Sequence, residues 1–153
     1  MLNAIFKGIS KILGNKSDRD IKLLIPRVEK INHHFEALKS LSNDELRTKT
    51  AEFKQRIADY LSEVVSEMDE LKQKVDDEPD MDVSEKEALF NRLDKLKKER
   101  NEKLEKVLDD LLEEAFAVVK ETARRFKENT ELKATATEYD RELAAKRPHI
   151  IIE

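Results

Sequence analysis

The residue types that most often carry chemistry are few in this chain, and their spacing assembles no catalytic site. The adjacent His33 and His34 are predicted to lie on a helix, where neighbouring side chains point in different directions, so they make a poor metal site. Gly8 and Gly14 are the only glycines, so neither a phosphate-cradling loop nor a dinucleotide-binding fingerprint can form. Cysteine is absent, which excludes thiol nucleophiles and thiolate metal sites. We therefore expect no catalytic residue, no cofactor and no bound metal in this chain.

One stretch has the oxygen ligands that a hard cation prefers. The run from Asp76 to Asp82 contains five acidic residues around Pro79. It lacks the glycine and the terminal glutamate of a helix-loop-helix calcium site, so we interpret it as a solvated turn between two helices.

The first 14 residues have a pattern suited to binding a surface, not to catalysis. Their pattern predicts a short amphipathic helix with Lys7 and Lys11 on its polar face. Lys16 follows just beyond it, and no acidic residue precedes Asp18. A basic amphipathic helix of this kind lies in an anionic lipid interface, although such a stripe can also dock on the rest of the protein. We predict membrane or partner binding by this helix. Its apolar stripe consists of Leu2, Ile5, Phe6, Ile9, Ile12 and Leu13.

The composition indicates long helices and an all-α fold. Charged residues make up 42% of the chain and aromatic residues only 5%, with two glycines and three prolines. The net charge of -4 with interleaved acids and bases gives no nucleic-acid signal. Since no apolar run is long enough to cross a bilayer, we expect a cytoplasmic protein, or one that associates peripherally with a membrane facing the cytosol.

The central elements are a second helix and a long helical hairpin. The second helix is predicted at 17–40, with a kink near Pro26. The hairpin spans 42–128 with its turn at 76–84, because apolar residues recur there at spacings of three and four. Capping boxes at Ser42 and Ser84 are predicted to begin its two helices. A helix of thirty-odd residues is roughly 50 Å long, so the hairpin should protrude as an arm.

The lower part of the second hairpin helix is apolar on more than one side, which is typical of an anchor packed against a larger body. We expect Phe116 and Val119 to be buried against the lower hairpin or the second helix. The tail at 129–153 is loosely structured, with a short helix capped by Thr137 and a possible strand at 150–152.

Three stretches together resemble the N-terminal region of the SecA family, the ATP-driven motors of bacterial preprotein export. The matching stretches are Leu13 to Arg19, Leu41 to Phe53, and Glu114 to Arg125. The resemblance implies that Met1 to Leu13 contacts anionic lipid and the SecYEG channel, and that the helix from Glu114 packs on the remainder of the motor chain. The residues implied in this motor packing are Ala115, Phe116, Val118, Val119 and Ala123.

The resemblance also implies that ATP and magnesium bind elsewhere in the full-length protein, because its nucleotide motifs would follow Glu153. The chain would then be an accessory, non-catalytic segment of a translocation ATPase, with the distal hairpin at 61–109 as an apparent insertion. The alternative is a stand-alone helical adaptor or scaffold that binds a membrane surface or a partner coiled coil. A homodimer is possible in either case.

Overall fold

The computed structural model describes residues 16–152 of the chain. Within them the chain forms four helices and no strand, which confirms the predicted all-α class. In chain order the helices are α2 (Lys16–Leu38), α3 (Asn43–Asp77), α4 (Val83–Glu128) and α5 (Glu138–Lys146).

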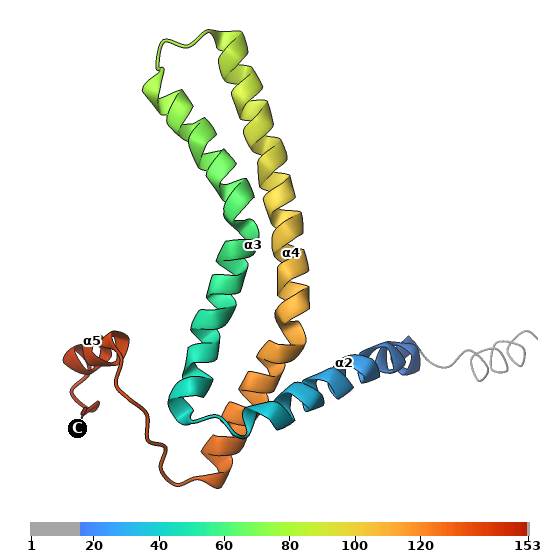
Figure 1. The fold of residues 1–153 in the computed structure, drawn as a ribbon, viewed down its shortest axis with the longest axis vertical. Coiled ribbons are helices and arrows are strands. Elements are labelled where there is room, and N and C mark those ends of the chain that lie inside the picture. Colours follow the sequence, from blue (N-terminus) through green and yellow to red (C-terminus); the bar gives the residue numbers. More distant parts are fainter. Residues whose placement is uncertain (1–15, 153) are drawn as a thin grey trace, which may run out of the picture.

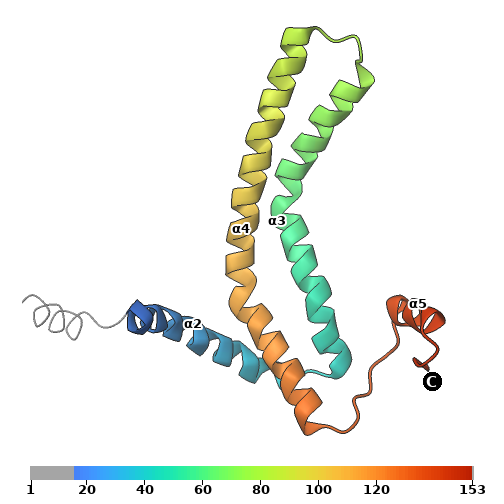
Figure 2. The same cartoon turned by 180° about the vertical axis from the view of Figure 1, so that it is seen from behind.

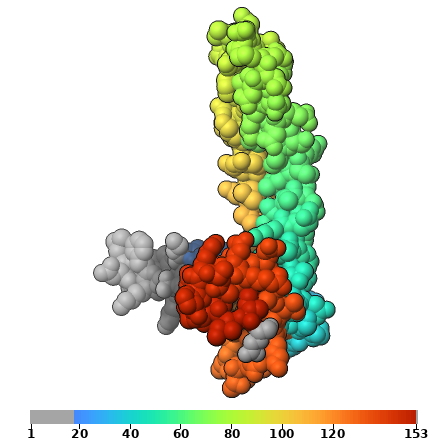
Figure 3. All heavy atoms as spheres, turned by 90° about the vertical axis from the view of Figure 1, so that its left-hand side faces the viewer, coloured from blue at the N-terminus to red at the C-terminus, as the bar shows by residue number. Residues whose placement is uncertain are grey.

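The helices α3 and α4 run antiparallel and form a long arm, with residues 78–82 at its tip (Figure 1). The helix α2 packs across the lower end of α4 and projects away from the arm, as the reverse view shows (Figure 2). Seen from the side, the C-terminal segment forms a rounded body beside the lower hairpin, while the upper arm stands clear of it (Figure 3).

The start of α3 is fixed by local side-chain chemistry. Ser42 Oγ accepts a hydrogen bond from the backbone N–H of Glu45 at 3.2 Å, and the Glu45 carboxylate accepts one from the Ser42 N–H at 2.7 Å. This is the capping box predicted from the sequence, and it satisfies two N–H groups that the first helical turn leaves free.

The start of α4 differs from the prediction. Asp82, and not Ser84, is the capping residue, and its carboxylate accepts a hydrogen bond from the Ser84 N–H at 2.9 Å. A carboxylate is at least as good a cap as a hydroxyl, and it lies two residues earlier, so the helix begins at Val83.

The hydrophobic core is divided into two clusters along the arm. The base cluster joins α2, α3 and α4 through Phe35, Leu38, Leu46 and Ala117. The distal cluster joins α3 and α4 through Val64, Met68, Leu93 and Leu96. Between them the half-buried Lys103 forms ion pairs with Glu99 at 3.2 Å and Glu63 at 3.9 Å. Each half of the arm is thus stabilised by its own apolar contacts.

Three local expectations have different outcomes. The helix α2 continues through Pro26 as far as Leu38. The tail contains the predicted short helix, which begins at a capping box formed by Thr137 and Asp140. Residues 150–152, however, form no strand. A strand needs a neighbour to satisfy its backbone hydrogen bonds, and the described residues supply none at this position.

Candidate docking face on the long helix

A buried ion pair in α4 holds the turn between α2 and α3. Glu121 is fully buried, and its Oε1 accepts a hydrogen bond from Arg125 Nε at 2.7 Å. Arg125 also donates to the carbonyl oxygens of Leu38 at 3.3 Å and Leu41 at 2.6 Å, and to Asn43 Oδ1 at 2.7 Å. Since the last carbonyl groups of a helix have no partner within it, one guanidinium here satisfies the end of α2 and fixes its approach to α3.

The same carboxylate is shared by a second arginine. Arg124 donates hydrogen bonds to both oxygens of Glu121 at 2.7 Å. Hydrogen bonds from Arg124, and then from Arg125, lower the pKa of Glu121 from its ordinary value of 4.5 to about 2, although burial opposes this change. The carboxylate is therefore charged at neutral pH, as the buried Arg125 requires.

Ion pairs nearer the middle of the arm fix which side of α4 faces α2 and which side faces α3. On the α2 side, Arg27 pairs with Asp109 at 2.7 Å. On the α3 side, Arg56 pairs with Glu114 at 2.7 Å. Positions five residues apart on a helix differ by about 140° in direction, so α2 and α3 occupy two different sectors around α4. A third sector has no neighbouring helix from the described part of the chain.

That third sector is apolar and exposed, and we call it the α4 face. Its large side chains are strongly exposed: Leu108 at 47%, Phe116 at 57%, Val119 at 66% and Phe126 at 69%. The stripe contains no charged residue and extends along roughly 27 Å of helix. An exposed apolar stripe of this length is typical of an interaction site. The α4 face comprises Leu108, Leu112, Ala115, Phe116, Val119, Ala123 and Phe126.

Four of the five residues predicted to pack on a motor domain share this face, namely Ala115, Phe116, Val119 and Ala123. The fifth, Val118, points elsewhere and packs against the base cluster. The predicted packing residues do not include Leu108, Leu112 and Phe126, which extend the α4 face at both ends. The sequence alone could have placed them on this face, because they continue the same helical spacing.

The expectation that Phe116 and Val119 are buried within this chain is wrong, since both lie on the exposed α4 face. The residue buried where the helices meet is Ala117, with no exposed surface. A small side chain allows the helices to approach closely at this point, and its neighbour Phe116 is consequently directed away from the contact.

The residues predicted to bind membrane or channel lie almost entirely outside the described part of the chain. This holds for Leu2, Ile5, Phe6, Lys7, Ile9, Lys11, Ile12 and Leu13. Lys16 is the first residue of α2. No helix among residues 16–152 is long and apolar enough to cross a bilayer.

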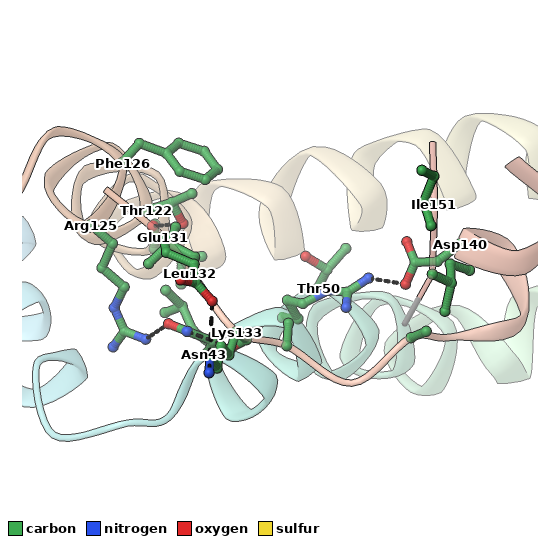
Figure 4. A pocket seen from close by; sticks show the side chains of 16 residues that line it. Asn43, Thr50, Thr122, Arg125, Phe126, Glu131, Leu132, Lys133, Asp140 and Ile151 are labelled. Carbon is green, nitrogen blue, oxygen red and sulfur yellow. Dashed lines mark hydrogen bonds and ion pairs between the residues drawn. The ribbon is translucent and has the colours of Figure 1, made fainter. Parts of the chain in front are cut away.

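A hollow of about 900 Å³ lies between the base of the hairpin and the C-terminal segment (Figure 4). Arg47 pairs with Asp140 at 2.6 Å within its lining, and Asn43 Nδ2 donates to the carbonyl oxygen of Lys133 at 2.7 Å. Phe126 of the α4 face also lines it. These polar groups hold the tail to α3, and they form no arrangement of nucleophile and base. The described residues also contain no cluster of three histidine or acidic side chains suited to a metal ion.

Comparison with known proteins identifies a family. The sequence profile described as the SecA DEAD-like domain matches residues 9–143. A protein translocase subunit SecA from Parabacteroides distasonis is 44% identical over 95% of this chain. The proteins of the same name from Amoebophilus asiaticus and Phocaeicola vulgatus are 47% and 49% identical over 97% and 90% of it.

The chain spans only about 13% of the length of the Parabacteroides and Amoebophilus relatives, and 12% of the Phocaeicola one. No solved structure matches the chain significantly.

Proposed function

The chain belongs to the SecA family, and we propose that it serves as a non-catalytic helical element of a protein translocase, docked on the body of the motor through the α4 face. The single observation that supports this most strongly is the uncharged stripe from Leu108 to Phe126, which no helix among residues 16–152 covers. The relatives are protein translocase subunits of which this chain matches about one eighth, so a much larger body is available to cover that stripe.

Burial of the α4 face would contribute enough free energy for stable docking. Phe116, Val119 and Phe126 each expose more than half of their surface. Full burial of one such side chain contributes about 1.5–3 kcal/mol. Several of them together can offset the loss of side-chain freedom on docking.

The N-terminal stretch is proposed to bring the translocase to the cytoplasmic face of the membrane. Its lysines and apolar residues suit anionic lipid, and the SecYEG channel is the partner implied by the family. ATP and magnesium would bind to the motor body of the full-length protein. The contribution of this chain would then be attachment, without a step of its own in ATP hydrolysis.

The docking proposal can be tested with two separately expressed parts. The chain is titrated into the Phocaeicola vulgatus SecA lacking its matching region, and binding is measured by calorimetry. We expect Phe116→Glu with Val119→Glu to weaken binding at least tenfold, because two charges would enter an apolar contact. Val83→Glu is the matched control, because Val83 is 80% exposed and lies at the far tip of the arm.

Equal affinity for the wild-type chain and the double variant would contradict docking through the α4 face.

The membrane role has a separate test in flotation with anionic vesicles. There Ile5→Asp should abolish binding, whereas Lys7→Glu with Lys11→Glu should weaken it mainly at low salt. If Ile5→Asp floats as well as the wild type, the membrane assignment is wrong.

A further inference from the structure

The first half of α2 has an apolar side that no part of the described chain covers. Every residue from 18 to 26 is exposed, and ion pairs with α4 begin at Arg27. This half of the helix projects from the base of the arm (Figures 1 and 2). Four apolar residues follow one side of it at helical spacing, and about half of each side chain is exposed. We call them the α2 stripe: Ile21, Leu24, Ile25 and Val28.

The spacing of the α2 stripe occurs in reverse order in the residues that precede α2. Each member of the stripe lies as far after Asn15 as one apolar residue of the predicted N-terminal helix lies before it. In two antiparallel helices joined by a short connection, residues at equal distances from that connection lie opposite each other. Folding the chain back about Asn15 would therefore join four apolar pairs. These are Leu2 with Val28, Ile5 with Ile25, Phe6 with Leu24, and Ile9 with Ile21.

The connection before α2 suits such a reversal of direction. Gly14 and Asn15 lie between the predicted N-terminal helix and Lys16, where α2 begins. Glycine is favoured just past the end of a helix, and antiparallel helices are commonly joined by two to five residues. A helix of about 13 residues is about 20 Å long, which is also the length of α2 from residue 17 to residue 29. The preceding residues can therefore cover the whole α2 stripe.

The charges do not oppose this arrangement. None of the four pairs contains a charged residue, so the contact would bury no lysine and no acid. Lys7 and Lys11 are predicted on the opposite side of the N-terminal helix from its apolar residues. They would stay in water when the helix is folded back, and they would remain available to an anionic surface.

We infer that the α2 stripe is the docking site of the first residues of the same chain, which fold back onto it about Asn15, and that an anionic membrane competes with α2 for their apolar side chains. The competition rests on the proposed membrane role, whereas the fold-back does not. The α2 stripe extends over only about two helical turns, so the closed form is favoured by a factor on the order of ten. A membrane can therefore open it.

Cross-linking within one chain tests the fold-back in dilute solution without lipid. The chain has no cysteine, so two introduced cysteines report a single contact. Ile5→Cys with Ile25→Cys should form an internal disulfide at least about ten times faster than Lys7→Cys with Leu23→Cys. The second pair is the matched control, because its residues are also equally distant from Asn15 but point away from the contact. Leu23 is 75% exposed.

Vesicle binding tests the competition. Leu24→Glu places a charge in the contact and opens the closed form, so this variant should bind anionic vesicles about tenfold more tightly than the wild type. Leu23→Glu is the matched control, since it adds the same charge one residue away on the side that faces water. It should bind vesicles no more tightly than the wild type.

The two experiments can fail separately. Equal disulfide rates for the two cysteine pairs would overturn the fold-back, and so would a cross-linked product with the mass of two chains. If Leu24→Glu binds vesicles no more tightly than Leu23→Glu, the competition is overturned. If the wild-type chain does not bind vesicles at all, both the competition and the proposed membrane role are wrong, and the disulfide rates still decide the fold-back.

Discussion

The substitution Glu121→Gln tests whether one buried charge holds the base of the arm together. Gln is nearly isosteric with Glu and keeps one oxygen that can accept from Arg125 Nε, so the substitution removes the charge together with the hydrogen bond that the other carboxylate oxygen accepts from Arg124 Nε. Arg125 is 8% exposed and would become a buried cation without a counter-charge. Removal of one partner from a buried pair is strongly destabilising for that reason.

The magnitude follows from the pKa of this carboxyl group. A pKa of about 2 in place of the ordinary 4.5 corresponds to at most about 3 kcal/mol of stabilisation at neutral pH. Its largest cause is hydrogen bonding to Arg124, whose side chain is 31% exposed and partly screened by water. We therefore expect Glu121→Gln to reduce the free energy of unfolding by roughly 2 kcal/mol at pH 7.

The pH dependence distinguishes this account from simple loss of packing. A carboxyl group whose pKa is lowered by folding contributes stability above its unfolded pKa and loses it as pH falls through the folded value. The difference between wild type and Glu121→Gln should therefore be complete above about pH 5 and shrink towards pH 2. Urea unfolding followed by circular dichroism at several pH values measures it. Other acids, such as Asp140 with its pKa of about 2, titrate in both proteins and cancel.

A matched control uses the other carboxylate that pairs with Arg124. Glu128 is exposed, so Glu128→Gln should change the free energy of unfolding by less than about 0.5 kcal/mol. If Glu121→Gln shows the same deficit at pH 7 and pH 2.5, the charge of Glu121 does not stabilise the fold. If Glu128→Gln is equally damaging, the loss comes from Arg124 rather than from the buried pair.

Two further predictions concern the arm and one concerns its base. Leu96 is fully buried in the distal cluster, so Leu96→Ala should cost about 2–5 kcal/mol in urea unfolding, and a loss below 1 kcal/mol would contradict tight packing there. Amide exchange should be faster in residues 72–90 than around Val64, because the tip lies beyond the buried residues of the distal cluster, and uniform protection would refute this. Phe116→Ala should change stability by less than about 0.5 kcal/mol, and a large loss would show that Phe116 has a partner within this chain.

The helices could be predicted from the sequence because their signals are local. The Ser42 capping box lies within four residues, and the Thr137 cap before α5 is equally compact. The apolar spacing of α3 likewise reports which residues face a partner. Its buried residues, Leu46, Val64 and Met68, all lie on the apolar stripe that recurs at spacings of three and four residues.

The side of α4 on which the α4 face lies could not be predicted, because it depends on contacts between distant segments. Apolar residues surround the lower part of α4 on several sides, and the sequence does not say which side α2 takes. The structure places Arg27 against Asp109, 82 residues away, and this contact assigns one sector to α2. Phe116 was expected in the core because spacing alone cannot distinguish a face packed within the chain from one awaiting a partner.

Because the core consists of two buried clusters, substitutions outside these clusters should have little effect on folding. The α4 face lies outside the base and distal clusters, so its side chains contribute little to folding of the described chain. Substitutions on this face should therefore alter association without unfolding the arm, whereas substitutions at Glu121 should destabilise the fold. A binding defect from Phe116→Glu with unchanged helix content can then be attributed to a lost interface.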